Sequence, residues 1–173
     1  MLLIARPAVA EYLPYFNRYI DLVPDGDLIA ALRDGADATR RLLEPLSEER
    51  ANYRYGPDKW SVKEVLGHLL DAERVFTYRA LRFARNDATP LPGFEENEWA
   101  PMAGHGKRTL RSLLEEHRAV RGATVALFEN LPEEAWSRVG TANDARMSVR
   151  AAAYIIAGHE IHHRNILRDR YLS

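Results

Sequence analysis

The fold of this chain is restricted above all by four long segments in which apolar residues recur with the period of an α-helix. These segments cover residues 27–45, 61–83, 107–130 and 148–168. Apolar residues spaced at about 100° form one face of a helix, and such faces are buried when helices pack together. None of the four segments alternates apolar and polar residues as a strand would. The sequence therefore predicts an all-α protein, a four-helix bundle, built by one domain over residues 1–173.

Start and stop signals indicate where these helices begin and end. Asp27 and Ser148 are favourable N-cap residues ahead of the first and last helices. Ser61 and Glu64 have the spacing of a capping box, in which each side chain bonds the backbone of the other residue. Pro132 follows the third helix and cannot continue it. The starts of three helices and the end of the third are thus predicted from local chemistry.

The segments between the helices are predicted to be turns and loops. Residues 86–106 form a long connection between the second and third helices, long enough to cross the end of the bundle, so the topology need not be simply up and down. We expect its acidic residues to face solvent and His105, set between glycines, to be exposed. A turn is expected at residues 143–146, and a short helix near residues 14–19.

The last helix carries the first functional signal. His159 and His163 stand four residues apart on its apolar face, so both imidazoles point into the protein. Each buried imidazole needs partners for its N–H and its lone pair. A helix that presents two histidines at this spacing can place two nitrogen ligands on one metal ion. His162 projects toward the edge of the face and is left out of the pair.

The same letters also fit the zinc-protease pattern H-E-x-x-H, through His159, Glu160 and His163. The extended pattern needs a glycine and a further histidine downstream, where this sequence has Ile166 and Asp169. Glu160 also projects away from the direction of the histidine pair. This interpretation is therefore disfavoured, and a third ligand is expected upstream.

Other polar residues fall on apolar helix faces. On the second helix, His68 lies at the edge of the apolar face, near Asp71, and Glu73 lies close to the centre of that face. His117 and Arg121 face inward on the third helix. A buried charge needs a partner and often marks a functional site, although structural pairs are also common.

Composition excludes several classes of function. Lysine and arginine number 24 and aspartate and glutamate 25, so the net charge of −1 gives no general attraction for nucleic acid or an anionic membrane. The chain has no cysteine, which removes disulfides and thiolate ligands and is compatible with the cytoplasm. The N-terminal apolar run is short and interrupted by Arg6 and Pro7, so we expect neither a signal peptide nor a membrane anchor. We expect a cytoplasmic protein.

Two motifs carry a resemblance to a known family. W-S-V-K-E-V-L-G-H over residues 60–68, followed by G-H-E-I-H-H-R over residues 158–164, resembles the DinB/YfiT superfamily of metal-dependent helical bundles. The resemblance extends to the entry of the first helix at residues 22–24 and to the loop at residues 92–94. Many relatives continue the last motif with Gly-Gln, where this chain has Asn165-Ile166.

The resemblance implies a metal site formed by His68, His159 and His163. With three nitrogen ligands, zinc or nickel is expected, with manganese or iron as further candidates. Three protein ligands leave further coordination positions on the metal for water or substrate. Arg121, Arg164, His117 and Trp99 are candidates for shaping the pocket, and the first three are also the candidate catalytic residues. Asp71 and Glu73 are candidates for supporting the ligands.

Three functions stay open from the sequence. The first is a metal-dependent enzyme, either a hydrolase or a transferase that uses a low-molecular-weight thiol such as bacillithiol or mycothiol, as some relatives do. The second is a metal-binding or stress-response bundle without turnover. The third is a structural bundle that binds no metal. We also expect a small-molecule substrate and a homodimer.

Overall fold

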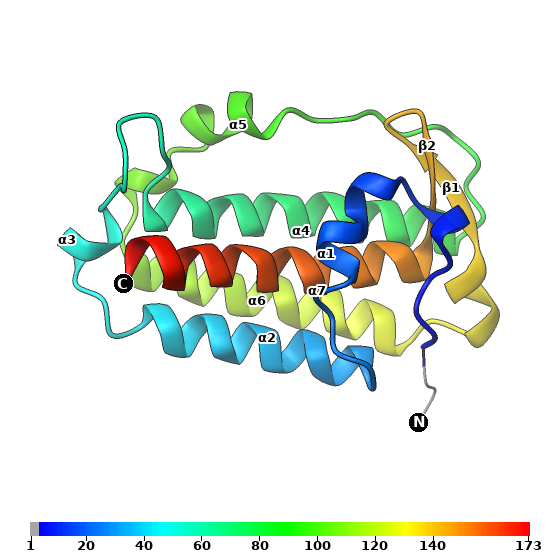
Figure 1. The fold of residues 1–173 in the computed structure, drawn as a ribbon. Helices are drawn as coiled ribbons and strands as arrows, with labels where there is room; N and C mark the ends of the chain where they lie inside the picture. Colours follow the sequence, from blue (N-terminus) through cyan, green and yellow to red (C-terminus); the bar gives the residue numbers. More distant parts are fainter. Residues whose placement is uncertain (1–3) are drawn as a thin grey trace.

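The computed structural model describes residues 4–173 and is organised around four long helices (Figure 1). They are α2 (Leu28–Leu43), α4 (Val62–Ala84), α6 (Leu110–Glu129) and α7 (Val149–Ile166). One turn of π-helix, Leu167–Tyr171, continues α7. The predicted four-helix bundle is confirmed. Residues 1–3 of the N-terminal apolar run lie outside the described range.

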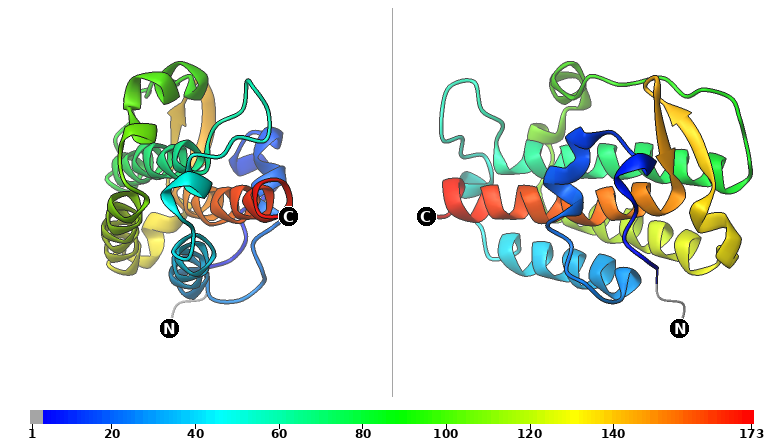
Figure 2. Two further views of the ribbon diagram at one scale, coloured as in Figure 1. Left: turned by 90° about the vertical axis from the view of Figure 1, so that its left-hand side faces the viewer. Right: turned by 45° about the vertical axis from the view of Figure 1, so that its right-hand side comes forward.

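The order of the helices around the bundle is α2, α6, α4, α7, and then α2 again. The end-on view in Figure 2 shows the same arrangement. In Figure 1, α4 and α6 run in one direction and α2 and α7 in the other. Two parallel neighbours require a long return connection, and residues 86–106 supply it by running back along α4 rather than only across the end of the bundle. The bundle is therefore not a simple up-and-down arrangement.

Local chemistry fixes the starts of the long helices as expected. The Asp27 side chain accepts hydrogen bonds from the backbone N–H groups of residues 29 and 30. Ser61 and Glu64 form both halves of the capping box. Ser148 accepts a bond from the backbone of residue 151. The third helix begins at Leu110 with Thr109 as its cap, so Lys107, where we expected the start, belongs to a preceding turn.

Short elements join the long helices. These are the 3-10 turns Val9–Glu11, Pro14–Phe16, His105–Lys107 and Glu133–Ser137, and the helices α1 (Asn17–Ile20), α3 (Glu48–Ala51) and α5 (Glu96–Ala103). The short helix predicted near residues 14–19 is thus present as a 3-10 turn followed by α1. Helix α5 lies within the long connection, where the sequence analysis expected only loop.

A β-hairpin precedes α7, where the sequence analysis expected only a turn at residues 143–146. Strand β1 (Val139–Ala142) pairs antiparallel with β2 (Ala145–Ser148), with Ala142 opposite Ala145. Asn143 and Asp144 form the two-residue loop at φ values of 51° and 58°. Asparagine and aspartate tolerate this left-handed region better than most residues, and it suits a tight hairpin turn. The strands are four residues long, too short for alternation to stand out.

The core consists of two apolar clusters separated by a polar layer. One cluster joins the start of α2 and α7 to the end of α4 and α6, and the other occupies the opposite end of the bundle. Between them, each long helix contributes a buried polar side chain: Thr39, Glu73, His117 with Arg121, and Glu160. Over residues 4–173, no helix combines the length and apolar character required to cross a membrane.

Candidate metal centre

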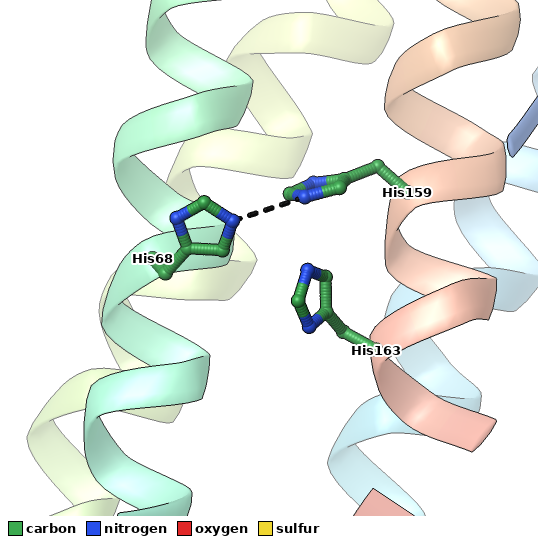
Figure 3. Close-up of side chains that lie close together, drawn as sticks. All are labelled: His68, His159 and His163. Carbon is green, nitrogen blue, oxygen red and sulfur yellow. Dashed lines mark hydrogen bonds between the residues drawn. The ribbon is translucent and has the colours of Figure 1, made fainter. Parts of the chain in front are cut away.

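Three histidines from two neighbouring helices meet at the side of the bundle. His68 comes from α4, and His159 and His163 come from successive turns of α7 (Figure 3). One ring nitrogen from each lies within 4.8 Å of the others. The Nε2 atoms of His68 and His159 are 3.0 Å apart. Helix packing between α4 and α7 therefore brings together the residues that the sequence analysis selected.

The environment of these imidazoles favours their neutral forms. Burial lowers the pKa of His68, although Glu96 and Asp71 act in the opposite direction. Burial lowers the pKa of His159 well below its usual value, and the neighbouring His163 adds to this effect. Burial, assisted by His68, lowers the pKa of His163 to about 3. Since a metal binds the unprotonated nitrogen, three neutral imidazoles form a suitable donor set at neutral pH.

The donor set also fits a metal in its spacing. Two nitrogens bound to one tetrahedral zinc ion at about 2.0–2.1 Å lie about 3.3 Å apart. The 3.0 Å separation between His68 and His159 is close to this value. Imidazole nitrogen is a ligand that zinc, nickel and related divalent metals accept readily.

Aromatic rings hold the histidines from both sides. The Trp60 ring lies 4.9 Å from that of His68, between centroids. The Tyr19 ring, from α1, contacts His159 edge to face at 5.0 Å and also approaches His162 at 5.3 Å. His162 is half-buried at the edge of the cluster and is not part of the group of three, as expected.

Gly158 allows α1 to approach the ligand helix. A Cβ atom at this position would lie 2.0 Å from the backbone oxygen of Tyr19. Because the obstacle is backbone, α1 must move away to accept any side chain, and Tyr19 would leave His159.

We expect Gly158→Ala to destabilise the protein by about 1–3 kcal/mol, measured by urea unfolding. Gly122→Ala is the control, because its Cβ would meet no atom within 4 Å and alanine favours helix by about 1 kcal/mol. Equal effects would contradict the explanation.

A hollow of about 10 Å³ adjoins the histidine cluster at His68. We call it the His68 hollow; it is lined by His68, Asp71, Phe94, Glu96, Trp99 and Ala100. Phe94 and Trp99, from the long connection and α5, pack with ring centroids 4.9 Å apart. The hollow therefore places an aromatic wall and two carboxylates beside one of the three histidines. Trp99 lies where the sequence analysis expected it, at the pocket.

A buried ion network lies on the inner side of the same helices. Arg121 donates two hydrogen bonds of 2.8 Å to Glu73 and one of 2.7 Å to Glu160. Thr39 donates to Glu160 at 2.8 Å, and His117 Nε2 lies 3.1 Å from the same carboxylate. Burial raises the pKa of Glu160, but Arg121 and His117 together outweigh it, and the pKa is held at about 2. Glu160 thus faces the bundle interior, away from a protease-like role, as the sequence indicated.

The network borders the histidine cluster. A cavity of about 10 Å³ is lined by Glu73, Arg121 and Glu160 on one side and by His159 on another. Gly35 on α2 makes room for the network, because a Cβ there would lie 2.7 Å from a Glu160 carboxylate oxygen. Glu160 immediately follows His159 in the sequence, so its bonds to α2 and α6 fix the rotation of the ligand helix.

The structure places the other candidate residues more specifically than the sequence could. His117 and Arg121 belong to the buried network, and Arg164 donates to the backbone oxygen of Gly35 at 3.3 Å. None of these three lines the His68 hollow. Their proposed catalytic roles stay predictions. Glu73, a candidate support for the ligands, has Arg121 as its direct partner.

His105 corrects an expectation. We predicted an exposed residue among glycines, but it is 7% exposed. Its Nε2 lies 3.1 Å from an oxygen of Asp71, and its ring occupies space left by Gly67 on α4. The sequence signal was the glycine directly before His68, but only the tertiary structure brings residues 67 and 105 together.

These observations define a class of protein: a helical bundle in which two adjacent helices bring three neutral histidines together beside a small hollow. Residues 31–167 match the family model described as the DinB superfamily. The chain belongs to this superfamily.

Related proteins agree in length and fold. The chain is 30% identical over 139 residues to a protein of Geobacillus thermodenitrificans provisionally named a metal-dependent hydrolase, covering 78% of this chain and 77% of the relative. A protein with the same provisional name from Geobacillus kaustophilus is 28% identical over 139 residues, covering 78% of this chain and 77% of the relative. A solved structure of YfiT from Bacillus subtilis, described as a "probable metal-dependent hydrolase with an unusual four-helix bundle topology", superposes with a TM-score of 0.72 at 18% identity, covering 82% of this chain and 84% of YfiT. The likeness to YfiT supports the fold.

Proposed function

We propose that this protein is a metal-dependent hydrolase of a small molecule, in which His68, His159 and His163 hold a divalent metal. One observation carries the proposal: three imidazoles, kept neutral by burial, converge from α4 and α7 beside a small hollow. The provisional names of the two Geobacillus relatives support the same activity.

Each part of the site has a task under this proposal. A divalent metal held by three imidazoles supplies a Lewis acid with open coordination positions. Phe94 and Trp99 give the His68 hollow an apolar wall beside one of the three ligands, and the hollow has room for about one water molecule. Trp60 and Tyr19 restrict the ring orientations of His68 and His159, so the donor nitrogens stay directed at one point. The expected metal is zinc or nickel, with manganese or iron as further candidates, because the ligands are all imidazole nitrogen.

The experiment combines metal content with turnover. Untagged protein is dialysed and its metal measured by elemental analysis, and hydrolysis of a panel of small esters and amides is then followed with and without chelator. We expect about one divalent metal per chain and turnover that the chelator removes and added metal restores. Protein that retains no metal would contradict the ligand assignment. Stoichiometric metal without turnover would instead favour the non-catalytic metal-binding function.

Transfer of a thiol is a finer prediction for the same centre. A low-molecular-weight thiol that enters an open coordination position should change the visible spectrum of cobalt-substituted protein, because thiolate is a strong ligand. Conjugation of that thiol to a model electrophile would then identify a transferase. An unchanged spectrum would leave hydrolysis as the proposed chemistry.

A homodimer also stays a prediction, for sedimentation equilibrium to test.

A further inference from the structure

Asp71 connects the metal centre to a buried histidine outside it. It stands three residues after His68 on α4, so the two side chains project from nearly the same side of the helix. Both line the His68 hollow. One carboxylate oxygen of Asp71, Oδ2, lies 3.1 Å from Nε2 of His105. The carboxylate is three-quarters buried, with its side chain 25% exposed.

Two glycines hold His105 in place. Its ring fits against Gly67, where a Cβ would lie 2.1 Å from the imidazole. Gly104, at φ 68°, turns the chain so that residue 105 enters the protein. The buried Nδ1 of His105 has no hydrogen-bond partner among residues 4–173. An unsatisfied buried nitrogen costs about 1–3 kcal/mol, so its retention calls for an explanation beyond stability.

The partner pattern indicates which proton His105 carries. A neutral imidazole has one N–H and one bare nitrogen. The N–H placed on Nε2 can be donated to Asp71, and Nδ1 is then the bare nitrogen. His105 in this form fixes one oxygen of Asp71.

His105 leaves the second oxygen of Asp71, Oδ1, uncontacted. Its nearest charged neighbour on α4 is Arg74, at 3.9 Å, and Arg74 itself pairs with Glu116 of α6 at 2.5 Å. From α5, the charged group that faces the hollow is Glu96. From the turn that precedes α6, the only group in direct contact among the described residues is His105. Asp71 therefore lines the hollow with one oxygen fixed by His105 and a second oxygen that His105 does not occupy.

We propose that Asp71 is the proton acceptor of this centre and that His105 is its positioning residue. The inference rests on the proposed hydrolase function. Asp71 takes a proton from the attacking water as the water oxygen forms its bond to the substrate carbonyl carbon. The electron pair of the broken O–H bond stays on oxygen. When the bond to the leaving group breaks, Asp71 returns the proton to that group, so the carboxylate is restored and no other reactant is consumed.

The test compares isosteric variants of the zinc-loaded protein. Asp71→Asn removes the acceptor, His105→Leu removes its support and His105→Gln keeps a donor near Asp71. Asp34→Asn, at an exposed position on α2, is the control for the same chemical change. With 4-nitrophenyl acetate as probe, we expect Asp71→Asn to lower kcat about 100-fold or more, with KM within about twofold and metal content unchanged. His105→Leu should lower kcat less, and His105→Gln should recover part of the loss.

Two further readouts separate a catalytic role from a structural one. The fall of kcat on the acid side of the pH profile, which reports protonation of the acceptor, should disappear in Asp71→Asn. In cobalt-substituted Asp71→Asn, the pH at which the change in visible absorption is half complete should be about one unit lower than in the wild type. The reason is that the Asp71 carboxylate disfavours negative charge in the hollow. The second readout needs no turnover, and it tests whether the Asp71 carboxylate acts on the metal centre even in a protein inert toward the ester.

The outcomes distinguish this inference from the proposed function. Metal-loaded Asp71→Asn that matches the wild type in kcat and in cobalt midpoint would overturn the role of Asp71 and leave the metal centre intact. A loss found in Glu96→Gln instead would assign the acceptor to Glu96 and also overturn it. Wild-type protein that binds no metal would overturn the proposed function and this inference together.

Discussion

Replacing His163 by alanine should abolish stoichiometric metal binding, whereas the same change at His162 should leave it intact. His163 is one of the three clustered ligands, and its removal leaves two imidazoles, too few to hold zinc firmly against dialysis. His162 is adjacent in sequence but lies outside the cluster, at the edge next to Tyr19. The two variants therefore differ in one structural respect, which is whether the imidazole reaches the common point.

Elemental analysis after dialysis measures the difference directly. Thermal unfolding gives a second measure, because a ligand at 100 times its Kd stabilises the folded protein by about 2.7 kcal/mol. For a chain of this size, that corresponds to a rise in Tm of roughly 5–11 °C. Zinc should produce this rise in wild type and in His162→Ala and should not in His163→Ala. Stoichiometric metal in His163→Ala would exclude the three-histidine assignment.

The histidine pair on α7 could be predicted because it depends only on helical geometry. Residues four apart on one apolar face lie together in any helix, and His159 and His163 have ring centroids 4.5 Å apart. The capping box at Ser61 and Glu64 is predictable for the same reason, since both partners belong to one turn. His68 was different. Its place beside His159 depends on α4 packing against α7, and the sequence indicated it through the bundle hypothesis and the family resemblance.

Interactions between distant segments were beyond the reach of the sequence. Glu73 was recognised as a buried carboxylate that needed a partner, but a periodic pattern cannot say that Arg121, 48 residues later, would supply two hydrogen bonds. His105 was placed at the surface because its neighbours are glycines. Its burial follows from the path of the long connection along α4 and from the space at Gly67, and both are properties of the folded chain.

Among the charged residues of α6, Arg121 should be the one whose replacement lowers the free energy of unfolding most. It is 3% exposed and neutralises two carboxylates, Glu73 and Glu160, that are 4% and 2% exposed. Arg121→Met keeps much of the volume but leaves both carboxylates without their cationic partner. Breaking a buried ion pair from one side costs about 3–5 kcal/mol. We therefore expect Arg121→Met to lower the free energy of unfolding by that amount, measured in urea.

Arg118→Met is the matched control, because Arg118 lies one turn earlier on α6 and is exposed, and its replacement should change stability by less than about 0.5 kcal/mol. The effect of Arg121→Met should shrink when Glu73 and Glu160 are changed to glutamine as well, since the uncompensated charge is then gone. Because Glu160 follows His159, the single variant should also weaken metal binding, whereas the control should not. A single variant as stable as the control would show that the polar layer does not depend on this guanidinium, and that the orientation of the ligand helix is set by apolar packing alone.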